Sequence, residues 1–114
     1  MRKRLTLMLV MAVFTTLYGF QPVSAQSNED LIRLLSGKDC RRCNLKDSDL
    51  MHADLRDADL HQAKLQRANL SRAKLDGADL SDSDLSFTSL QGASLQGADL
   101  RGSRLFGTDL RGSD

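Results

Sequence analysis

Two cysteines separated by two residues form the pattern in this chain with the most distinct chemistry. Arg41 and Arg42 lie between Cys40 and Cys43. Two cysteines in an exported chain usually pair as a structural disulfide, whereas a redox-active pair needs a lowered thiol pKa, which adjacent arginines favour. Haem attachment requires a histidine after the second cysteine, and Asn44 is there. We therefore predict a structural disulfide, with a thiol–disulfide redox role as the alternative.

The remaining polar side chains do not combine into a metal site or a catalytic set. His52 and His61 are too isolated to complete a zinc site with the cysteines. Asp59, Asp79 and Asp99 recur at intervals of 20 residues, but calcium needs six to eight oxygens. We expect each aspartate to cap backbone amides in its own turn instead. No Ser-His-acid set or phosphate loop can be argued, so the sequence predicts no enzyme, metal or cofactor.

A regular comb of leucines must position these residues. Leucine occupies every fifth position from Leu45 to Leu110, fourteen times without exception, and a small residue lies two positions before each. A period of five fits neither an α-helix nor a flat strand. It indicates a solenoid, in which Cys40 continues the comb and Cys43 takes a small-residue position, so both should face inward.

The repeated motif, as in Ala53-Asp54-Leu55 and Ala98-Asp99-Leu100, resembles the pentapeptide-repeat family. The resemblance implies an all-β solenoid, a right-handed quadrilateral β-helix whose coils hold four repeats, with about 3.5 coils over 40–114. Over residues 44–114, charge pairs between residues 20 or 15 apart are equally frequent, five opposite against two alike, so the coil of 20 rests on the resemblance. Glycines two residues after the leucine, common in the second half, predict corners whose geometry changes along the axis.

The first 25 residues have the pattern of a cleavable secretory signal peptide. A basic start is followed by an apolar stretch and then by small residues before a cleavage site between Ala25 and Gln26. We expect residues 26–39 to form a helix that caps the first coil. Ser27 would be its N-cap, paired with Asp30, and Gly37 would end it.

Two aromatic side chains occupy outward positions, where nearly all other residues are polar. Phe87 and Phe106 would be near neighbours on the last coils and could form a contact surface. The repeats run in register to Asp114 without a cap, so we also expect a homodimer through the C-terminal coil.

The charge balance favours neither nucleic acid nor, after signal cleavage, a membrane as the partner. Residues 44–114 hold 9 basic and 12 acidic residues. DNA mimicry against a topoisomerase, as in the quinolone-resistance members of the family, requires a longer and more acidic chain. The chain looks like the exported group of the family, from the cyanobacterial periplasm or the thylakoid lumen. We expect a non-enzymatic structural or protein-interaction module there, periplasmic, lumenal or secreted, with an unknown protein partner.

Overall fold

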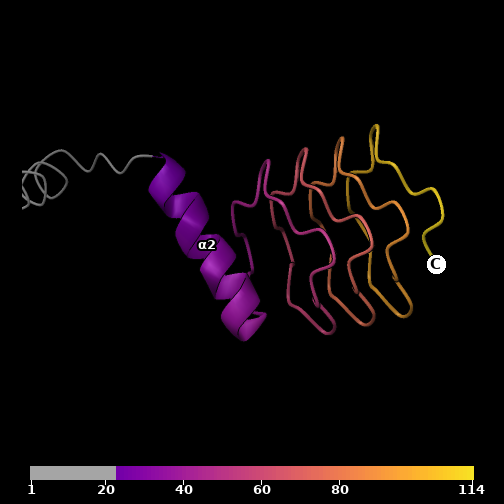
Figure 1. Ribbon diagram of the computed structural model, residues 1–114, viewed down its shortest axis with the longest axis horizontal. Helices are drawn as coiled ribbons and strands as arrows, with labels where there is room; N and C mark the ends of the chain where they lie inside the picture. Colours follow the sequence, from indigo (N-terminus) through magenta and orange to yellow (C-terminus); the bar gives the residue numbers. More distant parts are fainter. Residues whose placement is uncertain (1–22) are drawn as a thin grey trace, which may run out of the picture.

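The computed structural model describes residues 23–114. In these residues, one α-helix, α2 (Val23–Gly37), leads into a chain that winds in stacked coils (Figure 1). The predicted signal segment lies almost wholly outside the described residues, and the expected cleavage bond between Ala25 and Gln26 falls in the first turn of α2. Within residues 23–114, no helix is both long and apolar enough to cross a membrane.

The coil repeats every 20 residues. Parallel β-bridges join residues 20 apart from the Asp39–Asp59 pair to the Ser89–Asp109 pair. From Cys40 to Leu95, the backbone N–H of each central residue donates to a carbonyl of the next coil, as from Leu55 to Lys74 at 2.8 Å. Four repeats therefore complete one turn, which confirms the quadrilateral β-helix and settles the period that the charge pattern left open.

Leucine and small side chains fill the interior of the tower, as expected. The central leucines from Leu45 to Leu90 are at most 2% exposed. Where the small residue carries a hydroxyl, the hydroxyl bonds to a backbone carbonyl: Ser83 donates to Leu80 at 2.6 Å and Thr88 donates to Leu65 at 2.7 Å. These inward hydroxyls therefore keep hydrogen-bond partners, and each buried leucine contributes roughly 1.5–3 kcal/mol as an upper estimate.

All corners share one geometry, so the prediction that glycine marks a changed corner is wrong. The corner residues, two after each central residue, have positive φ whether or not they are glycine, from +55° at Asp82 to +72° at Gly102. A negative and then a positive φ is the pattern of a type II turn. At four of the six corner glycines, a side chain of the previous coil instead leans over the corner, whereas Gly97 and Gly112 lie over another glycine. Asp82 covers Gly102 in this way, and Phe87 covers Gly107.

Helix α2 covers the first coil, but its ends differ from those predicted. It begins at Val23 rather than at residue 26, so Ser27 lies inside the helix and is not its N-cap. The left-handed residue at its C-terminal end is Lys38, with φ of 57°, and not Gly37. The N–H of Lys38 donates to the carbonyl of Leu34 at 2.9 Å, which is the single bond of an αL cap.

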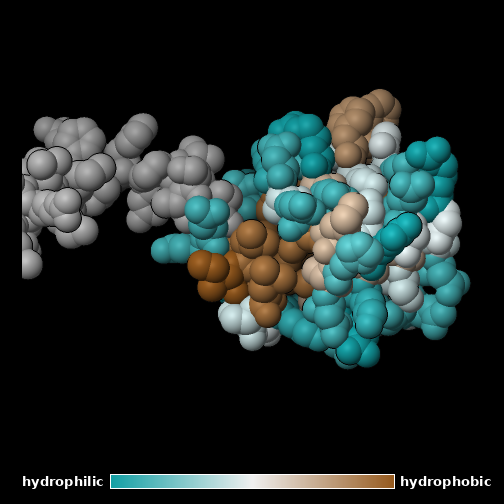
Figure 2. Space-filling model, viewed as in Figure 1, coloured by the Kyte–Doolittle hydropathy of each residue, from teal (hydrophilic) through white to brown (hydrophobic). Residues whose placement is uncertain are grey.

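The apolar side chains of α2 divide between two faces. Leu34 is fully buried and Leu31 packs against the core, whereas Ile32 and Leu35 are exposed. Figure 2 shows an apolar area, coloured brown, over α2 and a second one toward the C-terminal coils. The helix thus closes one end of the tower and leaves an apolar strip of its own in solvent.

Candidate functional site

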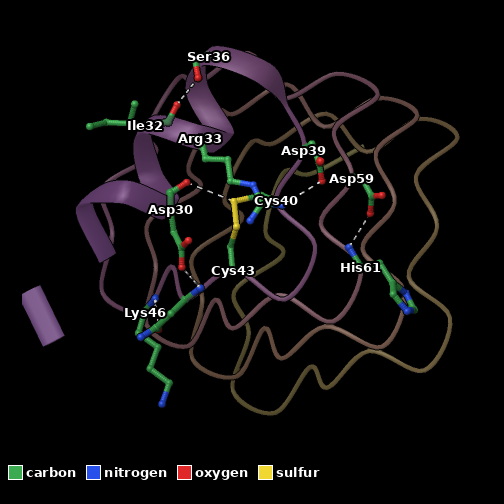
Figure 3. Close-up of a disulfide and its surroundings, with 11 residues drawn as sticks. Asp30, Ile32, Arg33, Ser36, Asp39, Cys40, Cys43, Lys46, Asp59 and His61 are labelled. Atoms are coloured by element: carbon green, nitrogen blue, oxygen red, sulfur yellow. Dashed lines mark hydrogen bonds and ion pairs between the residues drawn. A yellow bond between two sulfur atoms is a disulfide. The ribbon is translucent and has the colours of Figure 1, made fainter. Parts of the chain in front are cut away.

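The cysteine pair lies at the junction between α2 and the first coil (Figure 3). The sulfurs of Cys40 and Cys43 are 2.05 Å apart, and their Cα atoms are 5.1 Å apart. Both residues face the interior as predicted, with exposures of 0% and 2%. Thiol–disulfide exchange needs an attacking thiolate to reach a sulfur, so this burial disfavours a redox role and favours a structural one. That the bond is present in the cell stays a prediction.

The two arginines between the cysteines point outward, where they are bound by other groups. Arg42 donates from Nε to the side-chain oxygen of Gln62 at 2.8 Å. Arg41 lies 3.8 Å from a carboxylate oxygen of Asp59. Neither guanidinium is therefore directed at the buried sulfurs, which weakens the argument that they activate a thiol.

Asp30 is the residue at this junction that the sequence analysis misjudged. Its carboxylate accepts a hydrogen bond from the backbone N–H of Asn44 at 2.8 Å, and its carbonyl oxygen lies 3.2 Å from the Cys40 sulfur. A disulfide sulfur has no hydrogen to donate, so the second approach is a packing contact. Asp30 joins the helix to the first coil rather than capping the helix start. A clue was the position of Asp30 on the same helix face as Leu34, four residues on.

The aspartate column has the arrangement expected from the sequence. Bridges place Asp59, Asp79 and Asp99 in one line along the tower. Each carboxylate accepts the backbone N–H two residues on, as Asp79 does from Ser81 at 3.0 Å. The Ser81 hydroxyl and amide hold the pKa of Asp79 below its ordinary value, and Arg101 lowers the pKa of Asp99 to about 2. The carboxylates thus stabilise turns.

The histidines do not meet the cysteines or each other. His61 forms a hydrogen bond of 2.8 Å with the Ser81 hydroxyl through Nδ1, and His52 is exposed on another side. Among residues 23–114, no three His, Cys, Asp or Glu side chains are grouped as metal ligands would be. Neither histidine has a placement that suggests chemistry.

An open groove of about 540 Å³ runs along one corner of the tower. Its polar groups are hydroxyl, amide and guanidinium, and Arg111 is already held by Asp109 at 2.7 Å. No carboxylate or histidine lines it. The lining residues are Met51, Ser71, Arg72, Gln91, Gly92, Arg111 and Gly112.

Phe87 and Phe106 form an exposed aromatic pair near the last coils. Their ring centroids are 5.3 Å apart and their planes meet at 87°, the edge-to-face arrangement that aromatic rings favour. The side chains are 57% and 73% exposed, respectively. Phe87 has φ of 59° and its ring lies over Gly107. The structure therefore brings these two predicted contact residues together.

Comparison with known proteins places the fold in a family. The family model "Pentapeptide repeats" matches residues 34–62, 53–86 and 83–114. A pentapeptide repeat protein from Nostoc Pcc 7120, alr5209, is 36% identical, with a TM-score of 0.67 over 82% of this chain and 78% of that one. Rfr23 from the cyanobacterium Cyanothece 51142 is 24% identical, with a TM-score of 0.57 over 76% and 93%, a likeness of fold alone. No curated protein matches significantly. The leucine comb, the 20-residue coil and these matches show that the chain belongs to the pentapeptide-repeat family.

Proposed function

We propose that this chain is a non-enzymatic interaction module that works outside the cytoplasm and contacts a protein partner through Phe87 and Phe106. The exposed aromatic pair is the observation that carries the proposal. Aromatic side chains dominate the energy of protein interfaces because they bury a large area at low entropic cost. Two of them in contact on a surface that is otherwise mostly polar are costly to leave in water unless a partner covers them.

The tower supports this role because it holds the pair rigidly. Phe87 occupies a corner whose φ of 59° matches that of the other corners, and its backbone N–H donates to the carbonyl of Phe106 at 2.8 Å. A partner would therefore meet a preformed surface and pay little ordering entropy. Because leucine side chains fill the interior, a partner can bind only to the outer faces of the tower.

The proposed location rests on the sequence of residues 1–25 and on the cysteines. A basic start, an apolar stretch and small residues before Gln26 are the pattern of a secretory signal. Disulfides persist in oxidising compartments outside the cytoplasm. Intact mass of the chain recovered from its native cell should correspond to residues 26–114 with two fewer hydrogens than the dithiol. A full-length chain or free thiols in that material would contradict the location.

The interaction is tested with a tagged mature chain incubated in extract of its own compartment. We expect the same partner to be recovered reproducibly by the wild type and lost with Phe87→Ser/Phe106→Ser. Met51→Ser is the matched control, since Met51 is 49% exposed on a different side of the tower. Equal recovery by the phenylalanine variant and the wild type would rule out the aromatic pair as the contact.

A second candidate, self-association through the C-terminal coil, has an observation of its own. Leu105 and Leu110 are 40% and 39% exposed on this coil, and their backbone N–H groups, unlike those of Leu85 and Leu90, donate to no carbonyl in the described chain. Such free groups favour addition of another strand. The coil turns every five residues, so a second coil of this kind fits it better than a straight strand.

Light scattering of the mature chain over a range of concentrations tests self-association. We expect a dimer for the wild type and a monomer for Leu110→Arg, which adds a charge to the end of the coil. The Phe87→Ser/Phe106→Ser variant should still dimerise if the coil end alone is responsible. A monomeric wild type at high concentration would remove this candidate.

A further inference from the structure

The side of the tower that carries the aromatic pair has a distinctive charge. The bridges between coils stack the repeats of this side in one column. We call it the basic side, because it contains four basic residues against two acidic ones. The other three sides of residues 38–114 are neutral or acidic: one has four basic and five acidic residues, one has two of each, and one has two basic and four acidic. The repeats of the basic side are 43–47, 63–67, 83–87 and 103–107.

Most basic groups of this side are free to bind an outside charge. Arg67 is the exception, because it holds Asp47 through two hydrogen bonds of 2.7 and 2.9 Å. Within the described chain, Lys46, Lys64 and Arg104 have no carboxylate within 4.0 Å. Figure 3 shows Lys46 extending away from the disulfide.

The second carboxylate of this side is already bound within the tower. Asp84 accepts hydrogen bonds from Gln66 Nε2 at 2.7 Å and from the Ser86 N–H at 3.0 Å. It lies between Lys64 and Arg104 in the bridge column and only partly offsets them. Summed over its four repeats, the basic side therefore keeps a net positive charge, which lies mainly on Lys64, Arg67 and Arg104.

The cations and the aromatic rings share one surface. Arg104 and Phe106 both point outward from the same side, two residues apart, which is about 6–7 Å along extended backbone. Phe87 contacts Phe106 from the adjacent corner. An apolar spot beside cations fits a partner segment that combines an apolar side chain with carboxylates.

We infer that the basic side of the tower binds an acidic segment of the partner protein, with apolar side chains of that segment seated on Phe87 and Phe106. This inference rests on the proposed interaction function and names the chemistry of its partner. Nucleic acid is a poorer match, because the flanking sides are neutral or acidic and would repel a long polyanion that extended beyond this strip. A lipid surface is also a poorer match, because the cations form a single narrow strip rather than a broad patch.

The test is selection of random displayed peptides on the immobilised mature chain. We expect enrichment of peptides that combine Asp or Glu with Leu, Ile or Phe. A selected peptide should bind Lys64→Glu/Arg104→Glu on the order of tenfold more weakly, because charge reversal places like charges in contact. Binding should also weaken as salt rises, since a Debye length of about 8 Å at physiological ionic strength screens exposed charges.

The matched control is Arg72→Glu/Lys74→Glu, which makes the same charge change on two of the three sides that do not carry Lys64 or Arg104. It should bind the selected peptide as the wild type does. Circular dichroism melting of both variants checks that each is folded. Equal loss in both variants would mean that net charge, not the basic side, controls binding, and would overturn the inference.

Other outcomes separate this inference from the proposed function. If Phe87→Ser/Phe106→Ser loses binding and Lys64→Glu/Arg104→Glu does not, the aromatic contact stands and the acidic partner is wrong. Selection of peptides without acidic residues, or no selection at all, would also overturn the inference. Stronger binding of phosphatidylglycerol vesicles or single-stranded DNA, lost on the same charge reversal, would assign the surface to a membrane or a nucleic acid instead.

Discussion

The carboxylate of Asp30 in α2 accepts a 2.8 Å hydrogen bond from the backbone N–H of Asn44 in the first coil. This bond joins two elements whose contact is otherwise mainly apolar, through Leu31 and Leu34. It satisfies a backbone donor at the end of the tower, where no preceding coil is available to accept it. The position of α2 over the cysteines therefore depends on one polar side chain as well as on burial of leucines.

Asp30→Ala should loosen α2 and destabilise the fold. The variant leaves the partly buried Asn44 N–H without its acceptor, which costs about 1–3 kcal/mol in unfolding free energy. Urea unfolding followed by circular dichroism measures the loss, and Glu29→Ala is the control because its exposed side chain makes no hydrogen bond in the described chain. Similar stabilities for the two variants would contradict a joining role for Asp30.

Reduction of the cysteine pair should lower stability without abolishing the fold. The disulfide closes a very short loop, and loop-closure entropy then predicts a loss of about 2 kcal/mol on reduction. Because both sulfurs are buried, dithiothreitol should reach the disulfide and reduce it only as the first coil opens. Melting with and without dithiothreitol measures the effect, and Cys40→Ser/Cys43→Ser should melt at one temperature in both conditions. No shift in the wild type would show that the pair does not stabilise the junction.

The leucine comb predicted the solenoid because an interior filled by identical side chains repeats in the sequence. The coil period was not recoverable from charge, because only one of the seven ion pairs, Asp47–Arg67, joins residues 20 apart, and three join residues two apart. Asp54 is bound by Arg56 at 2.7 Å instead of by Lys74, whereas the Asp47–Arg67 pair does link coils. Ion pairs on exposed surfaces contribute little to folding stability, so they place little constraint on which charges occur in the sequence.

Contacts between coils are the other feature that local patterns did not predict. The role of Gly107 depends on Phe87, a residue 20 positions away, and not on its own corner. Asp30 likewise matches the pattern of a capping box but is held by Asn44 across the junction. Both contacts become visible only when the coils are stacked, whereas the Cys40 and Cys43 positions followed directly from the register of the comb.

Gly107→Ala should disturb the aromatic pair more than Gly97→Ala disturbs its own surroundings. Both glycines have positive φ, of +66° and +70°, so each alanine carries a strain of about 1 kcal/mol. A Cβ on Gly107 would lie 2.7 Å from a Phe87 ring carbon, whereas the nearest atom to one on Gly97 is 4.0 Å away. The variant at residue 107 should therefore lose roughly 1 kcal/mol more, as expected for overpacking.

The excess cost of Gly107→Ala is tested by a double-mutant cycle with Phe87→Ala. Removal of the ring leaves space for the added Cβ, so in that background the alanines at residues 107 and 97 should cost the same. The cycle is measured as the unfolding free energy of each variant. In the variants that keep Phe87, nuclear Overhauser contacts between Phe87 and Phe106 report the position of the ring. An excess that persists without the ring would place the strain in the backbone alone.

Acid should destabilise the tower between about pH 4 and pH 2. The Arg101 guanidinium and amide lower the pKa of Asp99 to about 2, and Arg111 lowers the pKa of Asp109 to about 2. An unfolded aspartate titrates near 3.9, so stabilisation by these groups is complete above that value and is lost as pH falls through the folded pKa. The melting temperature should be constant from pH 7 to about 5 and then decline. Arg101→Gln/Arg111→Gln should flatten the decline, whereas Arg72→Gln, which removes an arginine without an ion pair in the described chain, should leave it unchanged. A decline that starts above pH 5 would mean that histidines or other groups control acid stability instead.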